Sequence, residues 1–140
     1  MELADAEAFL AANHRAALVT LSADGTPHSS NISYHFAGGV ARVSVTAGRI
    51  KSRNLARDPR ALLHVFSDNW GQWLAAEGTA ELSAVSGAPG DEVGRELLDL
   101  YERIVGEAHP DRADFFAAMV RDRRLLISIP ITRVYGQLPS

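Results

Sequence analysis

Short strand-like segments, separated by turn residues, occupy most of the first 82 residues of this chain. They cover 16–21, 28–36, 40–46, 61–66 and 72–82. Clusters of Gly, Pro, Asp, Asn and Ser stand between them, which is typical of antiparallel strands joined by short turns. Because no strand is followed by a GxGxxG turn and a helix, a parallel dinucleotide-binding sheet is not expected.

The segment 28–36 has two chemically different faces. Side chains alternate along a strand, so Ile32, Tyr34 and Phe36 share one face. The other face is polar and carries Ser29, Asn31, Ser33 and His35. We expect this strand to form a hairpin with the strand before it and the next strand to follow in a meander.

Helical patterns flank and interrupt the strands. Apolar residues recur at helical spacing in 3–12, 50–57, 92–105 and 111–121. Gly78 predicts a β-bulge, and the segment 86–90 is the clearest flexible joint. Two β-rich pieces, 125–129 and 131–135, end the pattern on either side of Pro130, which has no N–H to donate to a ladder. The combination predicts an α+β fold whose mainly antiparallel sheet closes into a barrel.

Size and composition fit one domain over residues 1–140. With 46% hydrophobic and 22% charged residues the chain can form a core. It has no cysteine, so disulfides, thiolate metal sites and thiol catalysis are excluded. No apolar run approaches the length that spans a bilayer, and the first residues are acidic where a signal peptide is basic. We therefore expect a cytoplasmic protein without membrane partners.

Positive charge is concentrated in one stretch of an acidic chain. The formal net charge is -3, yet residues 49–60 contain five cations and only one acid, Asp58. Lys51 is the only lysine beside thirteen arginines and lies in this stretch, and lysine meets phosphate as a compact point charge. The stretch predicts an anionic ligand. Nucleic acid is not expected, because the remaining surface is acidic and the pI is about 5.9.

Hydroxyl groups, a glycine turn and cations converge at the start of the 50–57 helix. They are Ser44, Thr46, Arg49, Lys51 and Ser52. Free N–H groups and the macrodipole at a helix N-terminus favour an anion, so this stretch has the features of a phosphate-binding turn. An arginine-bearing surface helix without a ligand is the alternative, and the spacing alone favours neither.

Other polar and aromatic residues give weaker indications. The five histidines lack metal-site spacing, so no metal is expected. No GxSxG turn is present, and a hydrolase triad has no local support. His64 lies in an apolar strand and is interpreted as a core residue. Trp70 and Trp73 flank a turn, where they either pack in the core or cover a flat ring or subunit interface.

Four motifs in order resemble a known family. They are SSNISYHF at 29–36, TAGRIKSRNLARDPRALL at 46–63, EGTAEL at 77–82 and DRRLLISIPITRVYG at 122–136. Together they resemble the pyridoxamine-phosphate-oxidase-like split-barrel superfamily of flavin and deazaflavin oxidoreductases, and within it the actinobacterial branch that uses coenzyme F420. The likeness runs from about Ala17 to Pro139.

The resemblance implies a six-stranded split barrel that forms a homodimer with cofactor sites at the subunit boundary. It implies that Ser44, Arg49 and Lys51 hold the phosphate of the coenzyme, with Thr46 and Ser52 close by. It also implies that the strand with Ser30, Asn31 and Ser33 follows the ring system, and that the partner subunit's copy of the Trp70 and Trp73 segment covers the site. An arginine and histidine set for pyridoxal phosphate is not evident near the C-terminus, which argues against that oxidase activity.

We expect an oxidoreductase that moves a hydride from reduced F420 to an unsaturated small molecule. An FMN-dependent oxidoreductase is the alternative within enzymes, because FMN carries a phosphate too. A non-catalytic flavin- or deazaflavin-binding protein is the alternative outside them. The residues identify no catalytic side chain, since water, His28, His35 or Tyr34 are equal candidates for a proton donor.

Overall fold

The computed structural model describes residues 1–139, and Ser140, the last residue of the expected domain, lies outside that range. Within it the helices are α1 (Leu3–Ala12), α2 (Ile50–Arg57), α3 (Glu92–Val105) and α4 (Arg112–Arg121). The strands are β1 (Arg15–Leu21), β2 (Pro27–Ser33), β3 (His35–Ala37), β4 (Val40–Thr46), β5 (Arg60–Phe66), β6 (Trp73–Thr79), β7 (Glu81–Leu82) and β8 (Arg124–Gln137).

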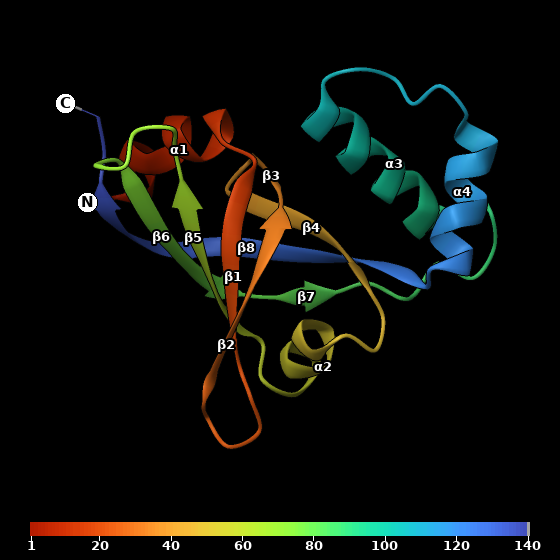
Figure 1. The fold of residues 1–140 in the computed structure, drawn as a ribbon, viewed down its shortest axis with the longest axis horizontal. Helices are drawn as coiled ribbons and strands as arrows, with labels where there is room; N and C mark the ends of the chain where they lie inside the picture. The colour runs from red at the N-terminus through yellow and green to blue at the C-terminus, as the bar shows by residue number, and fades with distance from the viewer. Residues whose placement is uncertain (140) are drawn as a thin grey trace.

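The strands form one antiparallel sheet that curls into a half-barrel (Figure 1). Their order is β2-β1-β5-β6-β8-β4-β3, and β7 pairs with β8. Six strands are long, whereas β3 and β7 have three and two residues. The α+β split-barrel prediction is confirmed. Figure 1 shows α1 at one end of the barrel, α2 at the other, and α3 and α4 beside it.

The long strand β8 joins the two halves of the sheet. Its first part pairs with β4 up to Pro130, and its second part pairs with β6 from Ile131 onward. Two separate strands were expected here, and that expectation is wrong. Pro130 is tolerated because it sits where the partner strand changes, and Ile131 donates its N–H to Gly39 across 2.9 Å.

The expected strand 28–36 is broken at Tyr34. The backbone N–H of Tyr34 donates to the carbonyl of His14 across 2.9 Å, outside both ladders. The chain therefore leaves β1 after Ser33 and begins β3 at His35, which pairs with Arg42 of β4. The predicted hairpin is confirmed, and the predicted meander is confirmed only in part: the end of the expected strand, β3, pairs with β4, whereas β2 does not.

Gly78 is the predicted bulge. The register of β6 against β8 shifts between Glu77 and Gly78. A Cβ atom at Gly78 would overlap the carbonyl oxygen of Pro130. Glycine is therefore required where the two strands change register, and the sharper bend helps the sheet to curl.

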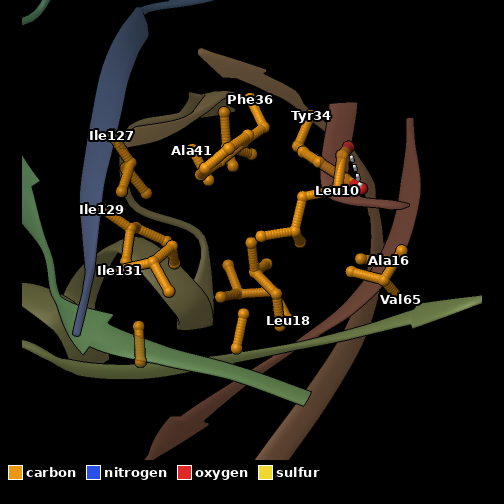
Figure 2. Packing of buried hydrophobic residues seen from close by; sticks show 14 of the residues in the cluster. Leu10, Ala16, Leu18, Tyr34, Phe36, Ala41, Val65, Ile127, Ile129 and Ile131 are labelled. Carbon is orange, nitrogen blue, oxygen red and sulfur yellow. Dashed lines mark hydrogen bonds between the residues drawn. The ribbon is translucent and has the colours of Figure 1, made fainter. Parts of the chain in front are cut away.

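The barrel interior is the main core of the protein. Leu18, Leu63 and Ile127 are fully buried there. Helix α1 covers one end, and Figure 2 shows Leu10 of this helix packed beside Tyr34. The Tyr34 hydroxyl donates to the carbonyl of Leu10 across 2.8 Å, so the one polar atom of this buried ring is satisfied. Burial raises the pKa of Tyr34, which keeps its phenol protonated.

A second, smaller core lies under the helical hairpin of α3 and α4. It is formed by Leu97, Leu98, Leu100, Phe115 and Leu126. The last of these belongs to β8, so the hairpin packs on the outside of the barrel. The carboxylate of Asp91 caps α3 by accepting from the N–H of Gly94 across 2.7 Å. Asp99 ties α3 to β4 through an ion pair of 3.1 Å with Arg42.

Candidate functional site

A small cavity of about 170 Å³ lies where β4 leads into α2. Ser44, Val45, Thr46, Arg49, Lys51 and Arg124 line it. Thr46 and Arg124 are paired in the β4–β8 ladder. The sheet therefore brings a cation from the end of the sequence to the basic stretch that begins at position 49.

The turn before α2 has a defined local structure. Gly48 has a φ of 83°, in the left-handed region that favours glycine. Arg49 then stands at the N-cap position of α2. Ser52 is only 4% exposed, and its hydroxyl donates to the carbonyls of Arg49 (2.9 Å) and Thr46 (3.3 Å). Ser52 thus stabilises the turn from inside and does not line the cavity. The first backbone N–H groups of α2 have no partner within the helix, so they are free to donate to a ligand.

Arg49, Lys51 and Arg124 form a cationic cluster without a counter-ion. Among residues 1–139 none of the three is within ion-pair distance of a carboxylate. Burial lowers the pKa of Lys51, and the charges of Arg49 and Arg124 lower it further. The Nε of Arg124 is buried and makes no hydrogen bond. These features fit an anionic group, which would partner all three cations.

The other cations of the basic stretch are engaged elsewhere or lie outside the cavity. Arg57 donates to the carbonyl of Leu21 (2.8 Å) and the side chain of Asn54 (2.9 Å). Arg60 forms an ion pair of 2.7 Å with Asp58. Arg53 does not line the cavity. The cationic cluster therefore contains only two cations of the basic stretch, Arg49 and Lys51, together with Arg124 from β8.

A larger cavity of about 510 Å³ adjoins the cationic cluster. It shares Ser44, Lys51 and Arg124 with the small cavity. Its other polar residues are Asn31 and Ser33 of β2. Its apolar wall comes from β2 and the helical hairpin and consists of Ile32, Leu97, Leu100, Tyr101, Ile104, Val105, Phe115 and Met119. The arrangement suits a molecule with an anionic end and a flat or apolar end.

Two of the three residues of β2 that the resemblance implies lie beside the cationic cluster. Asn31 and Ser33 line the larger cavity together with Ser44 and Lys51. Ser30 is not among the lining residues. Its hydroxyl is buried without a hydrogen-bond partner.

Trp70 and Trp73 lie in a different part of the protomer. They line a separate cavity of about 470 Å³ together with His64 and Phe66. Trp70 is 91% exposed, and Trp73 stacks on His64 with ring centroids 5.2 Å apart. The interpretation of His64 as a core residue is wrong, because its side chain lies on the outer face of β5 against these rings. Within one protomer the tryptophans do not reach the cationic cluster.

His28 and His35 do not line the two cavities beside the cationic cluster. The Nδ1 of each is buried without a hydrogen bond, and His35 stacks on His14 with centroids 6.1 Å apart. Burial lowers the pKa of His35, and Arg42 and Arg103 lower it further. In the described part of the chain no group of three or more His, Asp or Glu side chains is placed to hold a metal ion.

Two contributions to the site were not found from the sequence. Arg124 is distant in sequence from the basic stretch and reaches it only through the β4–β8 pairing. The apolar wall of α3 and α4 has the same spacing as an ordinary amphipathic helix face. The sequence does show a run of charged residues, DRR at 122–124, between a helix and a strand. Only the register of β4 with β8 shows that Arg124 of this run reaches the basic stretch.

Residues 1–139 contain no helix with the length and apolar character that crossing a membrane requires. The longest, α3, has 14 residues and a charged outer face.

Comparison with known proteins gives consistent matches across the chain. The sequence profile of a family described as pyridoxamine 5'-phosphate oxidase matches residues 3–137. The F420(H2)-dependent biliverdin reductase of Mycobacterium tuberculosis (strain CDC 1551 / Oshkosh) is 31% identical over 134 residues, which are 94% of this chain and 85% of that protein.

Solved structures share the fold. An F420 reductase has a TM-score of 0.68 and 27% identity, with 94% of this chain and 96% of that one covered. General Stress Protein 26 from Bacillus anthracis strain Sterne has a TM-score of 0.67 and 15% identity, with 100% and 97% covered. At 15% identity the second likeness concerns the fold alone.

Proposed function

Since the chain belongs to the pyridoxamine 5'-phosphate oxidase family, we propose that it is an oxidoreductase that uses coenzyme F420 to reduce an unsaturated small molecule. The similar proteins named for F420 support this choice of coenzyme. The observation that carries the proposal is the cationic cluster without a counter-ion, which opens into a cavity with an apolar wall.

Ser44, Arg49 and Lys51 would hold the phosphate of the coenzyme. The hydroxyl of Ser44 and the two cations supply charge-assisted and neutral hydrogen bonds to phosphate oxygens. Thr46 lines the same small cavity, and Ser52 keeps the turn in shape. When bound, reduced F420 supplies the hydride. The protein residues would bind it, orient it and exclude water from the reacting atoms.

Asn31 and Ser33 would provide polar contacts along the ring system. They project into the larger cavity opposite the helical hairpin. Their side chains offer donors and acceptors to ring heteroatoms, while Leu97 and Phe115 cover apolar surface. In this proposal the sheet would recognise the polar groups of the coenzyme, and the helices would exclude water.

A homodimer belongs to the same proposal. Phe66, Trp70 and Tyr135 are exposed aromatic side chains, and Trp73 lies edge-on to Tyr135 with centroids 6.3 Å apart. An exposed aromatic surface of this kind is typical of an interface. We expect a dimer by analytical ultracentrifugation, weakened by Trp70→Ala; a wild-type monomer at micromolar concentration would contradict this part of the proposal.

The family also supports FMN as the coenzyme. FMN ends in a phosphate that the cationic cluster would accept, so the same site serves both hypotheses. Protein that is yellow after purification would favour FMN over F420. Saturable binding of either coenzyme, without hydride transfer to enones, quinones or nitro compounds, would favour a non-catalytic binding protein.

The test is a fluorescence titration of F420 with the wild-type protein and two variants. We expect saturable quenching or a spectral shift at micromolar wild-type protein. Lys51→Ala should weaken binding by about 1–2 kcal/mol, or roughly five- to thirtyfold in Kd, because a charge-assisted hydrogen bond is lost.

Arg53→Ala is the matched control for Lys51→Ala, since it removes a cation from the same helix outside both cavities. It should leave the affinity within about twofold of wild type, a difference of less than 1 kcal/mol. Equal affinity of the wild type and Lys51→Ala for F420 would move the phosphate to another site.

A further inference from the structure

Arg124 occupies an unusual position for an arginine at the start of a strand. Its Nε is buried and without a hydrogen bond, and its side chain lines both cavities of the site. An unpartnered buried donor is costly, so it calls for a partner such as a ligand, an ion or an ordered water. Its only charged neighbours around the small cavity are Arg49 and Lys51, which repel it.

The backbone on both sides of Arg124 is anchored to other segments. Arg123 has a φ of 51° and is the one non-glycine residue among 1–139 with a positive φ. Its carbonyl accepts the N–H of Ala47 across 2.8 Å, and the carbonyl of Arg124 accepts the N–H of Ser86 across 2.8 Å. The left-handed residue thus turns the chain sharply from α4 into β8, between two anchored segments.

The number of cations sets the charge of the ligand. Arg49, Lys51 and Arg124 face one small cavity whose lining includes no acid. A ligand with one negative charge would leave most of this charge without a partner in a partly desolvated site. A ligand with two or more negative charges would satisfy more of it and also the Nε of Arg124.

We propose that Arg124 is a binding residue that completes a three-cation site, and that this site selects ligand groups bearing at least two negative charges. The inference rests on the proposed function and deepens it. FMN offers this charge as a phosphomonoester, whereas the phosphate of F420 is a diester with one negative charge and its further charges are on carboxylates beyond it. The chemistry that the two coenzymes share is the phosphate group itself.

Methyl phosphate and dimethyl phosphate test the effect of ligand charge on binding without any coenzyme, because they differ in charge but little in size. At pH 8 the first is a dianion and the second a monoanion of nearly equal size. We would titrate each into the ¹⁵N-labelled protein and follow the amide signals of Thr46 and Gly48. Wild-type protein should bind methyl phosphate at least tenfold more tightly than dimethyl phosphate.

The Arg124→Gln variant tests the residue itself. It should lose at least tenfold in affinity for methyl phosphate but less than threefold for dimethyl phosphate, and Arg124→Lys should recover part of the loss. Arg121→Gln is the matched control, because Arg121 is exposed, pairs with Asp122 and lines neither cavity. Thermal unfolding of each variant verifies that it is folded.

Equal methyl phosphate affinity in folded Arg124→Gln and wild type would overturn the proposal, as would equal wild-type affinity for the two phosphates. Titration with FMN and with F420 then identifies which coenzyme the site binds. The affinity of that coenzyme should fall in Arg124→Gln by the same factor as the affinity of methyl phosphate. If the phosphate results hold but neither coenzyme binds wild-type protein, the three-cation site stands and the proposed function fails.

Discussion

The barrel and the helical hairpin contribute to the site in different ways. Among the described residues the barrel core contains 22 buried hydrophobic side chains, whereas the hairpin core contains five. The barrel, together with the helix α2 at its end (Figure 1), supplies the cationic cluster and the polar residues of β2, and the hairpin supplies most of the apolar wall. The charged groups of the candidate site thus lie on the unit with the larger core, whereas its apolar wall lies mainly on a unit that is held on by few contacts.

The attachments between the two units are few and identifiable. Leu126 of β8 belongs to the hairpin core. On the polar side, Asp99 of α3 accepts from Arg42 of β4 (3.1 Å), and Arg103, on the same helix as Asp99, donates to the same carboxylate (3.0 Å). Burial raises the pKa of Asp99, but the hydrogen bonds from the two arginines outweigh it and leave the pKa below its ordinary value. The side chains of this network are partly exposed, so its stabilising effect is small.

The largest effect should come from the barrel core. Leu63→Ala removes a fully buried side chain, and we expect the free energy of unfolding to fall by about 2–5 kcal/mol. Urea denaturation followed by tryptophan fluorescence measures this. Leu62→Ala, the partly exposed neighbour on the same strand, is the control and should cost less. A loss below about 1 kcal/mol for Leu63→Ala would show that the barrel is not the rigid unit.

A smaller and local effect should follow from removing the cap of α3. The carboxylate of Asp91 accepts from the N–H groups of Gly94 (2.7 Å) and Gly87 (2.9 Å) and from the hydroxyl of Ser86 (2.9 Å). Asp91→Ala should destabilise the hairpin by about 1–2 kcal/mol. Hydrogen exchange should accelerate in α3 and α4 while slow amides of β5 remain protected. Equal acceleration in both units would contradict the comparison.

The same carboxylate predicts an acid dependence. Hydrogen bonds from the amides of Gly94 and Gly87 lower the pKa of Asp91 to about 2, below the ordinary value of 3.8. A lowered pKa in the folded state stabilises the hairpin above pH 3.8, and this stabilisation is lost as the pH falls toward 2. Methyl NMR signals of Leu97 should therefore shift in that range before those of Leu63. Asp91→Asn should remove this early transition.

The smallest effect concerns the left-handed residue between the two units. Arg123→Gly keeps the φ of 51° without the steric cost of a side chain. We expect the protein to gain about 0.5 kcal/mol in stability. Thermal unfolding against Ala117→Gly, at an exposed position in the interior of α4 where glycine is unfavourable, measures the difference. Equal destabilisation by both substitutions would show that position 123 is not strained.

Local patterns were sufficient to predict most elements and the fold class. Alternation identified the strands, and the bulge at Gly78 and the turn at Gly48 followed from glycine alone. Strand pairing was harder, because the break at Tyr34 depends on a hydrogen bond from its amide to His14, which lies in another part of the sequence. Pro130 likewise reads as a strand end until the change of partner strand is known.

In the candidate site, too, local patterns could be interpreted from the sequence, whereas contacts that depend on strand pairing could not. Ser44, Arg49 and Lys51 lie within one short stretch that has the features of a phosphate-binding turn, although its spacing alone favours neither an anion site nor a surface helix without a ligand. Arg124 joins them only through the register of β4 with β8. Trp70 and Trp73 would illustrate the same limit if the proposed homodimer forms, because residue spacing within one chain carries no signal for a contact with a partner subunit's site.

The most direct test of the central claim is a crystal structure of the wild-type protein soaked with F420. We predict phosphate density within hydrogen-bond distance of Ser44, Arg49 and Lys51, and ring density in the larger cavity beside Asn31 and Ser33. Density for the phosphate at another surface, with the cationic cluster in contact with solvent only, would contradict the account.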